Sequence, residues 1–468
     1  MYEEIYQKFI KCAFDKCNLN SYEGKIIAAV SGGSDSVGML LLLNELFGKD
    51  RIICAHFNHK IRMGDSDEDA SFVRNLSASL GIDFVYDEAD VPYFAENNQF
   101  GLEEAARILR YDFLRRVAGN NYIAVAHNKG DKIETILHNI SRGTSIDGLK
   151  GIEYKKNNIV RPILDLSKED INYICEYFRI KPVFDKTNSD NSYTRNKIRN
   201  KILPFLKNEL NDSFEEHILQ LSNSASIDSL FLEKYTKETF EDVCTIRSQP
   251  FFKIELNYLK YSALDVAIKR RLIRFILSQI INADNKFVFP EYTGIYSDMI
   301  LRVENALEIK DTGKITEVAA GVVCVSDYNG SYFTHKDTLN SFDKIKDKII
   351  VRELSIEEVQ NIDFYNKPLN IEYFDAHKME RLYGINFRNI IKIKSWNNKD
   401  IIYPIGMEKS KKIRDILINS KVGRFERQFV KLVTIDNDVL WIPKIRRSNI
   451  AAIDKNSTRV IIIEYVSE

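Results

Sequence analysis

The sequence has few cysteines and no close cysteine pair. Its six cysteines, at positions 12, 17, 54, 175, 244 and 324, form no C-x-x-C motif. This spacing predicts neither a metal site nor a disulfide framework and is typical of reduced thiols. No apolar run approaches ~18 residues, and Glu3 and Glu4 stand where a signal peptide needs positive charge. We therefore expect a cytoplasmic protein that has no membrane partner.

Net charge is also absent, because 67 basic residues balance 67 acidic ones. A neutral chain excludes a polyanion-binding surface that covers the whole molecule, so any nucleic-acid site must be a local patch. The 44% apolar content is that of a folded protein, and 468 residues exceed one ordinary core. We expect two or three domains.

A glycine-rich turn without a lysine follows the apolar run at residues 26–30 and precedes a second apolar run at 37–47. Strand, turn and helix in this order direct free backbone N–H groups at an anion. The absence of a lysine excludes the P-loop that grips a transferred γ-phosphate. A serine-rich helix cap is the alternative explanation. The candidate nucleotide-binding residues are Ser31, Gly32, Gly33, Ser34, Asp35 and Ser36.

The turn, S-G-G-S-D-S, resembles the pyrophosphate loop (PP-loop) of ATP pyrophosphatases. That resemblance implies cleavage of ATP between the α- and β-phosphates to adenylate a substrate. The Asp35 carboxylate would repel phosphate unless a cation lies between them.

Strands and helices alternate through the first 130 residues. Apolar patterns predict strands at 51–59, 84–86 and 122–126, and helices at 66–80 and 102–117. Such alternation predicts an α/β fold with a doubly wound parallel sheet covered on both faces. Ligands of these sheets bind beyond the carboxyl ends of the strands.

Several polar residues lie at those strand ends. His127, Asp131 and Glu134 follow the fourth strand and would meet beside the loop, a suitable place for Mg²⁺ and a cationic amine. An Asp cap with a first-turn Glu is the alternative. Arg107 lies one helical turn from Glu103, and an exposed ion pair between these side chains is the commoner outcome of such spacing.

Two basic segments are candidates for phosphate contacts. Arg195 and Arg199 share a helical face, which is either solvated or binds phosphates. Residues 408–447 hold eleven basic and five acidic side chains, a local excess in a neutral chain. Phosphate oxygens are the expected partner of such a patch.

Five stretches together resemble the tRNA(Ile)-lysidine synthetase family, with matching order and spacing over about the first 210 residues. They are H-F-N-H-K-I-R, N-Q-F-G-L-E-E-A-A-R-I-L-R-Y, A-H-N-K-G-D-K-I-E-T, S-R-G-T-S-I-D-G-L-K-G and D-K-T-N-S-D-N-S-Y-T-R-N-K-I-R-N-K-I-L-P. The resemblance implies adenylation of C2 of the wobble cytidine in a CAU-anticodon isoleucine tRNA, with release of pyrophosphate. The ε-amine of free L-lysine then displaces AMP.

The chain departs from this family at one motif. Where A-H-H-x-D-D-Q-x-E-T is usual, Asn128, Gly130 and Lys132 replace the second His, the first Asp and the Gln. The family's important acid corresponds to Asp131. The resemblance implies that the loop holds pyrophosphate, that Asp35 and Asp131 position Mg²⁺, that Arg107 and His127 stabilise negative charge, and that Glu134 orients lysine.

The resemblance also implies three domains. We expect a PP-loop catalytic domain at 1–212, a helical tRNA-binding middle domain at 213–345 with long helices at 228–240 and 263–281, and a small α/β tRNA-binding domain at 384–468. The C-terminal domain would engage the acceptor stem. The candidate tRNA-binding residues are Arg195, Arg199, Lys411, Lys412, Arg414, Arg424 and Arg427.

Three alternatives stay open from the sequence. A tRNA thiolase of the same superfamily normally needs paired catalytic cysteines, and a glutamine-fed synthetase needs an amidase domain, neither of which is found. A protein that only binds tRNA disagrees with the intact Asp35, Arg107, His127 and Asp131. The sequence leaves a homodimer open.

Overall fold

The computed structural model describes residues 1–60, 65–183, 194–248, 251–283, 297–308, 313–319, 321–327, 330–340, 347–354, 358–359 and 366–467. Ile61 and Arg62 of the first of the five stretches, and residues 185–193 of the fifth, lie outside this part. The chain divides into two compact units, Met1–Phe231 and Leu232–Glu468, which are described separately.

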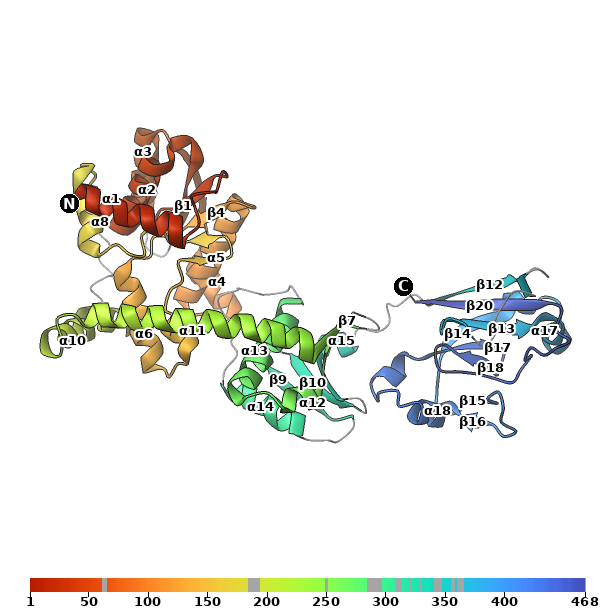
Figure 1. The fold of residues 1–468 in the computed structure, drawn as a ribbon. Coiled ribbons are helices and arrows are strands. Elements are labelled where there is room, and N and C mark those ends of the chain that lie inside the picture. Colours follow the sequence, from red (N-terminus) through yellow and green to blue (C-terminus); the bar gives the residue numbers. More distant parts are fainter. Residues whose placement is uncertain are drawn as a thin grey trace. The chain divides into compact units, whose positions relative to one another are not determined.

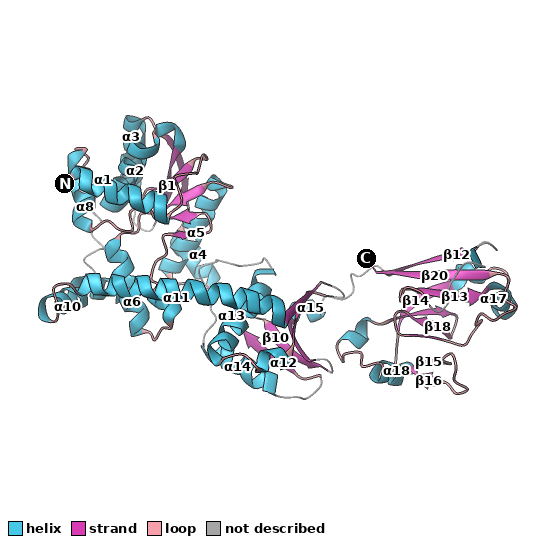
Figure 2. Cartoon of the chain, in the orientation of Figure 1, coloured by secondary structure: helices cyan, strands magenta, loops and turns pink. Residues whose placement is uncertain are grey.

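A six-stranded sheet forms the centre of the first unit (Figures 1 and 2). Its order is β3-β2-β1-β4-β6-β5. All neighbours run parallel except the edge pair β5 and β6. The predicted doubly wound sheet is therefore confirmed, with one antiparallel edge strand added. The strands are β1 (Ile26–Ala29), β2 (Ile52–Asn58), β3 (Asp83–Glu88), β4 (Tyr122–Ala124), β5 (Lys155–Lys156) and β6 (Ile159–Val160).

Successive residues of β1 contribute to different cores, as the period of a strand requires. Ile26 and Ala28 join the core formed with α1, α2 and α8, whereas Ile27 joins the core that contains Tyr111 and Phe113 of α5. The helices of this unit are α1 (Tyr2–Lys11), α2 (Ser34–Phe47), α3 (Asp65–Leu80), α4 (Val91–Asn98), α5 (Leu102–Ala118), α6 (Lys129–Ser141), α7 (Ile146–Leu149), α8 (Lys168–Tyr177), α9 (Thr194–Lys197), α10 (Leu203–Glu209) and α11 (Phe214–Val243), which continues into the second unit.

Strand order reverses at β1. The chain moves from β1 to β2 and β3 on one side and then returns to β4 on the other. In open α/β sheets this reversal leaves a crevice at the carboxyl ends of the two central strands, where ligands bind. The glycine-rich turn follows β1 and the His127 motif follows β4, so both reach this crevice.

The second unit begins with helices that pack on an antiparallel sheet. The long helices predicted for this segment are present, and a five-stranded sheet of order β7-β8-β11-β10-β9 accompanies them. The elements are α12 (Tyr258–Ser262), α13 (Val266–Ala283), α14 (Ser297–Glu308), α15 (Lys336–Asn340), β7 (Cys244–Arg247), β8 (Lys253–Leu256), β9 (Ile315–Ala319), β10 (Val322–Asp327) and β11 (Gly330–His335).

The C-terminal part consists of antiparallel sheets with short helices, as Figure 2 shows. Its last strand pairs with both β12 and β13, so residues 347–375 share a sheet with the chain's end. Among the described residues no helix is both long and apolar enough to cross a bilayer. The elements are β12 (Asp347–Glu353), β13 (Ile371–Asp375), β14 (Ile391–Ser395), β15 (Ile401–Ile402), β16 (Lys411–Lys412), β17 (Lys431–Ile435), β18 (Asp438–Ile442), β19 (Arg446–Arg447), β20 (Val460–Ser467), α17 (Ala376–Tyr383) and α18 (Ile413–Asn419).

Candidate active site

The turn after β1 is held by its own serines. The Ser36 hydroxyl accepts the Ser31 N–H (3.1 Å) and donates to the Gly33 carbonyl (2.9 Å). Gly32 has φ of +99°, a conformation that side-chain-bearing residues rarely adopt. No side chain caps α2, whose N-cap is Gly33. The first-turn N–H groups of this helix therefore stay available to an anion, as predicted from the sequence.

Asp35 has a partner on each oxygen. Its Oδ1 accepts the Asn128 side-chain amide at 3.1 Å, and its Oδ2 pairs with Lys168 Nζ at 2.7 Å. The same ammonium donates to the Ser34 hydroxyl at 2.8 Å. The loop, which contains no lysine, is therefore contacted by a lysine at the start of α8.

Lys168 was missed as a site residue in the sequence. It follows a capping box, in which the Ser167 hydroxyl accepts the Asp170 N–H and the Asp170 carboxylate accepts the Ser167 N–H. This cap begins α8 at Lys168. The signal was a basic residue at the first position of a capped helix, but only the fold shows which loop lies beside it.

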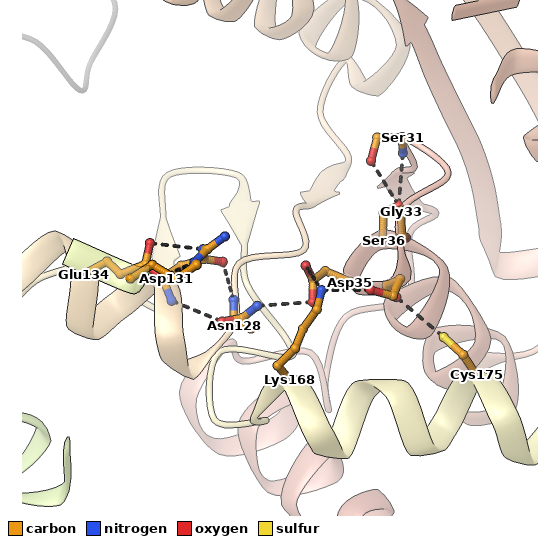
Figure 3. A network of polar contacts seen from close by, with 11 residues as sticks. Ser31, Gly33, Asp35, Ser36, Asn128, Asp131, Glu134, Lys168 and Cys175 are labelled. Atoms are coloured by element: carbon orange, nitrogen blue, oxygen red, sulfur yellow. Dashed lines mark hydrogen bonds and ion pairs between the residues drawn. The ribbon is translucent and has the colours of Figure 1, made fainter. Parts of the chain in front are cut away.

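Asn128 caps α6 and connects it to the loop. Its side-chain oxygen accepts the Asp131 N–H (3.1 Å), and the Asp131 carboxylate accepts the Asn128 N–H (2.9 Å). Figure 3 shows Asn128 between Asp35 and Asp131. The alternative in which Asp caps the helix is therefore partly right, since Asp131 belongs to the capping box while Asn128 is the cap itself.

The other two departures from the family motif are compatible with this cap. A Cβ atom on Gly130 would lie 3.2 Å from Asn128 Oδ1, so a larger residue would press on the capping amide. Lys132 is buried with its ammonium 4.7 Å from the centre of the Tyr154 ring. Burial lowers the pKa of Lys132. Gly130 and Lys132 therefore leave the capping box of Asn128 and Asp131 intact.

Asp131 and Glu134 share one guanidinium. Arg199, in the helical turn Ile198–Ile202, lies 3.0 Å from Asp131 Oδ1 and 3.0 Å from Glu134 Oε2. The Glu134 side chain is 6% exposed and that of Arg199 is 40% exposed. Burial raises the pKa of Asp131 and of Glu134, and Arg199 opposes both shifts. The pair attracts a cation, and in this structure an arginine occupies it.

His127 and Arg107 lie in a cationic part of the same edge. Arg161 Nε donates to His127 Nδ1 at 3.2 Å. Burial, followed by the nearby Arg161, holds the pKa of His127 well below its usual value. The Arg107 guanidinium lies over the Tyr111 ring, 5.3 Å from its centre. Both residues therefore stand among positive charges that suit a phosphate.

Of the remaining predicted residues, Arg195 acts electrostatically on His127 and Glu134, and the others lie in the second unit. Arg195 pairs at 3.5 Å with Glu103, which the sequence had placed one turn from Arg107. In the second unit Lys411, Lys412 and Arg414 line a hollow of about 580 Å³ together with Ser410, Asp415 and Asn419. Arg427 donates to the Val422 carbonyl (3.0 Å), and Arg424 lies between these two residues in the chain.

The described residues contain no cluster of three or more His, Cys, Asp or Glu side chains that could hold a metal. Two partly exposed carboxylates, Asp35 and Asp131, do meet near the loop through Asn128. Such a pair fits Mg²⁺, which binds one or two carboxylates together with substrate phosphates rather than a closed protein cage.

The loop, the sheet and the polar cluster define an ATP-using enzyme of the PP-loop class, and a model of the PP-loop domain matches residues 2–206. A model of the TilS substrate C-terminal domain matches residues 391–463. The tRNA(Ile)-lysidine synthase of Caldanaerobacter subterraneus is 31% identical over 97% of this chain and 96% of its own length. That of Clostridioides difficile is 32% identical over 98% and 99%. The chain belongs to the tRNA(Ile)-lysidine synthase family and is an ATP-dependent ligase.

A solved structure is similar at a lower level. The U34-tRNA thiolase NcsA from Methanococcus maripaludis has a TM-score of 0.40 and 17% identity, covering 47% of this chain and 77% of that chain. The nearly full-length relatives are lysidine synthases, so they do not favour the thiolase alternative.

Proposed function

We propose that this chain ligates L-lysine to C2 of the wobble cytidine of a CAU-anticodon tRNA(Ile) through an adenylated cytidine. The observation that carries the proposal is the joining of two sites by Asn128. Its amide contacts Asp35 of the nucleotide loop, and its cap fixes Asp131 of the acid pair. An anion site and a cation site therefore share one sheet edge, as a reaction between ATP and an amine requires.

In the first step the loop would bind the departing pyrophosphate. The N–H groups at the start of α2 would donate to its oxygens, and Lys168 would neutralise part of its charge. Asp35 and Asp131 would hold Mg²⁺, which supplies charge neutralisation at the phosphates when bound. Arg107 and His127 would donate to the α-phosphate as negative charge develops during attack by the cytidine oxygen.

In the second step the acid pair would bind the lysine amine. Glu134 is nearly buried and Asp131 is partly buried, so an ammonium group would find two carboxylates in a region of reduced solvation. Arg199 already contacts both acids. Lysine binding at this pair therefore requires the Arg199 side chain to move.

The tRNA would contact basic residues on both units. The hollow at Lys411, Lys412 and Arg414 and the surplus of positive charge in residues 408–447 support a phosphate-binding surface. Arg195, Arg199, Arg424 and Arg427 remain predictions of the same kind. We propose domains at 1–212, 213–345 and 384–468, the last of which shares its sheet with residues 347–375. The six cysteines lie buried as free thiols, which is compatible with a cytoplasmic location.

The test uses Asp131→Asn, which removes a charge but keeps an oxygen for the helix cap. We expect lysine-dependent AMP release to be lost while binding of tRNA(Ile) is retained. The control is Asp83→Asn, which changes an exposed acid paired with Lys25. Loss of tRNA binding in the Asp131 variant would reassign this residue.

The substrate is tested with the unaltered protein. Incubation with ATP, labelled lysine and bulk tRNA should label one isoleucine species. Label in no tRNA, or in several unrelated species, would contradict the proposal.

A further inference from the structure

Neighbouring strands bring Arg161 and His127 together. Strand β4 pairs in parallel with β6 through Ile123 with Ile159 and Ala124 with Val160. Arg161 follows β6 directly, and His127 follows the end of β4. Arg161 is 5% exposed, and its Nη1 also donates to the Glu153 carbonyl at 2.8 Å. The guanidinium is therefore fixed from two sides when it meets the imidazole.

This contact determines the tautomer of His127. A guanidinium has N–H donors and no acceptor, so Arg161 Nε must donate. His127 Nδ1, 3.2 Å away, must accept with its lone pair. A neutral imidazole with a free lone pair on Nδ1 carries its proton on Nε2.

The surroundings also keep this ring neutral. The largest charge effects on His127 come from four guanidiniums: Arg161 after β6, Arg110 and Arg107 on α5, and Arg195 on α9. A second proton would add a cation beside them. Burial and these charges together hold the pKa of His127 well below its usual value. The ring is therefore a neutral donor at physiological pH.

We propose that Arg161 is a positioning residue for the ligase reaction, which fixes His127 as the Nε2–H donor for the charge that develops on the α-phosphate. The proposal rests on the role proposed for His127 above. Arg161 itself need not touch ATP, because its Nε already donates to His127 and its Nη1 donates to the Glu153 carbonyl. It would act by holding the orientation and the tautomer of its neighbour.

A second buried histidine, His56, serves as an internal control for the tautomer of His127. His56, on β2, is buried with Nδ1 2.8 Å from the Val30 carbonyl. A carbonyl only accepts, so Nδ1 of His56 must carry the proton. The two histidines should therefore show opposite tautomers in one spectrum.

The first experiment is ¹⁵N NMR of the histidine-labelled, full-length protein. Resonances of His127 and His56 are assigned by their loss in His127→Gln and His56→Gln. We expect Nε2 of His127 and Nδ1 of His56 to be protonated, without titration of His127 between pH 8 and 6. A protonated Nδ1 on His127 would overturn the proposal without any change to Arg161.

The second experiment measures adenylation of tRNA(Ile) by Arg161→Met and Arg161→Lys. We expect Arg161→Met to lower kcat about 10- to 100-fold, the cost typical of losing an outer hydrogen-bond partner, with little change in KM for ATP. Arg161→Lys keeps a donor and should recover part of the rate. The control, Arg179→Met, removes an exposed arginine from the turn after α8.

In Arg161→Met the His127 resonances should also titrate at higher pH than in the unaltered protein. Unchanged kcat together with an unchanged His127 spectrum would refute the proposal. If His127→Gln adenylates tRNA normally, the role proposed for His127 fails, and the role of Arg161 in the reaction fails with it. In that case the NMR spectra report only whether Arg161 fixes the tautomer of His127.

Discussion

Replacement of Lys168 by methionine should weaken ATP binding without unfolding the protein. The Lys168 ammonium contacts Asp35 and Ser34 of the loop, and its side chain is 50% exposed while that of Asp35 is 31% exposed. Ion pairs this accessible to water stabilise a fold by about 0–1 kcal/mol. The variant should therefore melt close to the unaltered protein, which separates an effect on ATP from an effect on folding.

The magnitude follows from what the ammonium would contact. A hydrogen bond to a charged group contributes about 1.5–3 kcal/mol, which corresponds to about 10- to 150-fold in affinity. Exposure favours the lower end of this range. The loss of Lys168 also leaves the Asp35 carboxylate unneutralised beside the phosphates. The resulting repulsion enlarges the loss of affinity. We expect the KM for ATP to rise about 10- to 100-fold. If Lys168 holds ATP equally before and during reaction, kcat should change little.

The assay is ATP–pyrophosphate exchange in the presence of tRNA(Ile), measured over a range of ATP concentrations. Lys168→Arg keeps the charge and should retain most of the affinity. The matched control is Lys8→Met. Lys8 pairs at 3.7 Å with Asp170 of α8, the helix that also carries Lys168, and its side chain is 56% exposed. An unchanged KM for ATP in Lys168→Met, with normal melting, would refute the role of this lysine in ATP binding.

Three further predictions concern the other sites. Glu134→Gln should raise the KM for lysine about 10-fold or more and spare ATP–pyrophosphate exchange, which steady-state assays of both steps will check. Burial raises the pKa of Glu134, so this acid protonates at higher pH than an ordinary carboxylate. Glu134 is proposed to act only in the lysine step, so as the pH falls lysine-dependent AMP release should decline at a higher pH than ATP–pyrophosphate exchange does, in parallel pH profiles. Replacing Lys411 and Lys412 by Gln should weaken tRNA binding and flatten its salt dependence by about one unit of slope per lysine, measured by filter binding.

The sheet and its loop could be predicted because their signals are local. Apolar runs of strand length, a glycine pair after one of them and capped helices between them are visible within short windows. The helix predicted at 66–80 is α3 at Asp65–Leu80, and that predicted at 102–117 is α5 at Leu102–Ala118. Parallel strands then place the motif residues at one edge without further information.

The pairings within the site could not be predicted, because they depend on packing between distant segments. Lys168 and Asp35 are 133 residues apart, and Arg199 and Glu134 are 65 apart. The sequence suggested either solvent or phosphate for Arg199, whereas the structure places it on the acid pair. Nothing within a short window distinguishes a helix face that meets water from one that meets a buried carboxylate.

The departure at Asn128 has a physical consequence for how the two steps are connected. An amide side chain offers both donors and an acceptor, so Asn128 can cap α6 through its oxygen and hold Asp35 through its nitrogen at the same time. Asparagine is also among the preferred N-cap residues. A displacement of the loop would therefore pull on the cap that positions Asp131, and movement of α6 would change Asp35. The nucleotide site and the acid pair are joined through one side chain, so a shift of Asp35 should also shift Asp131, and the reverse.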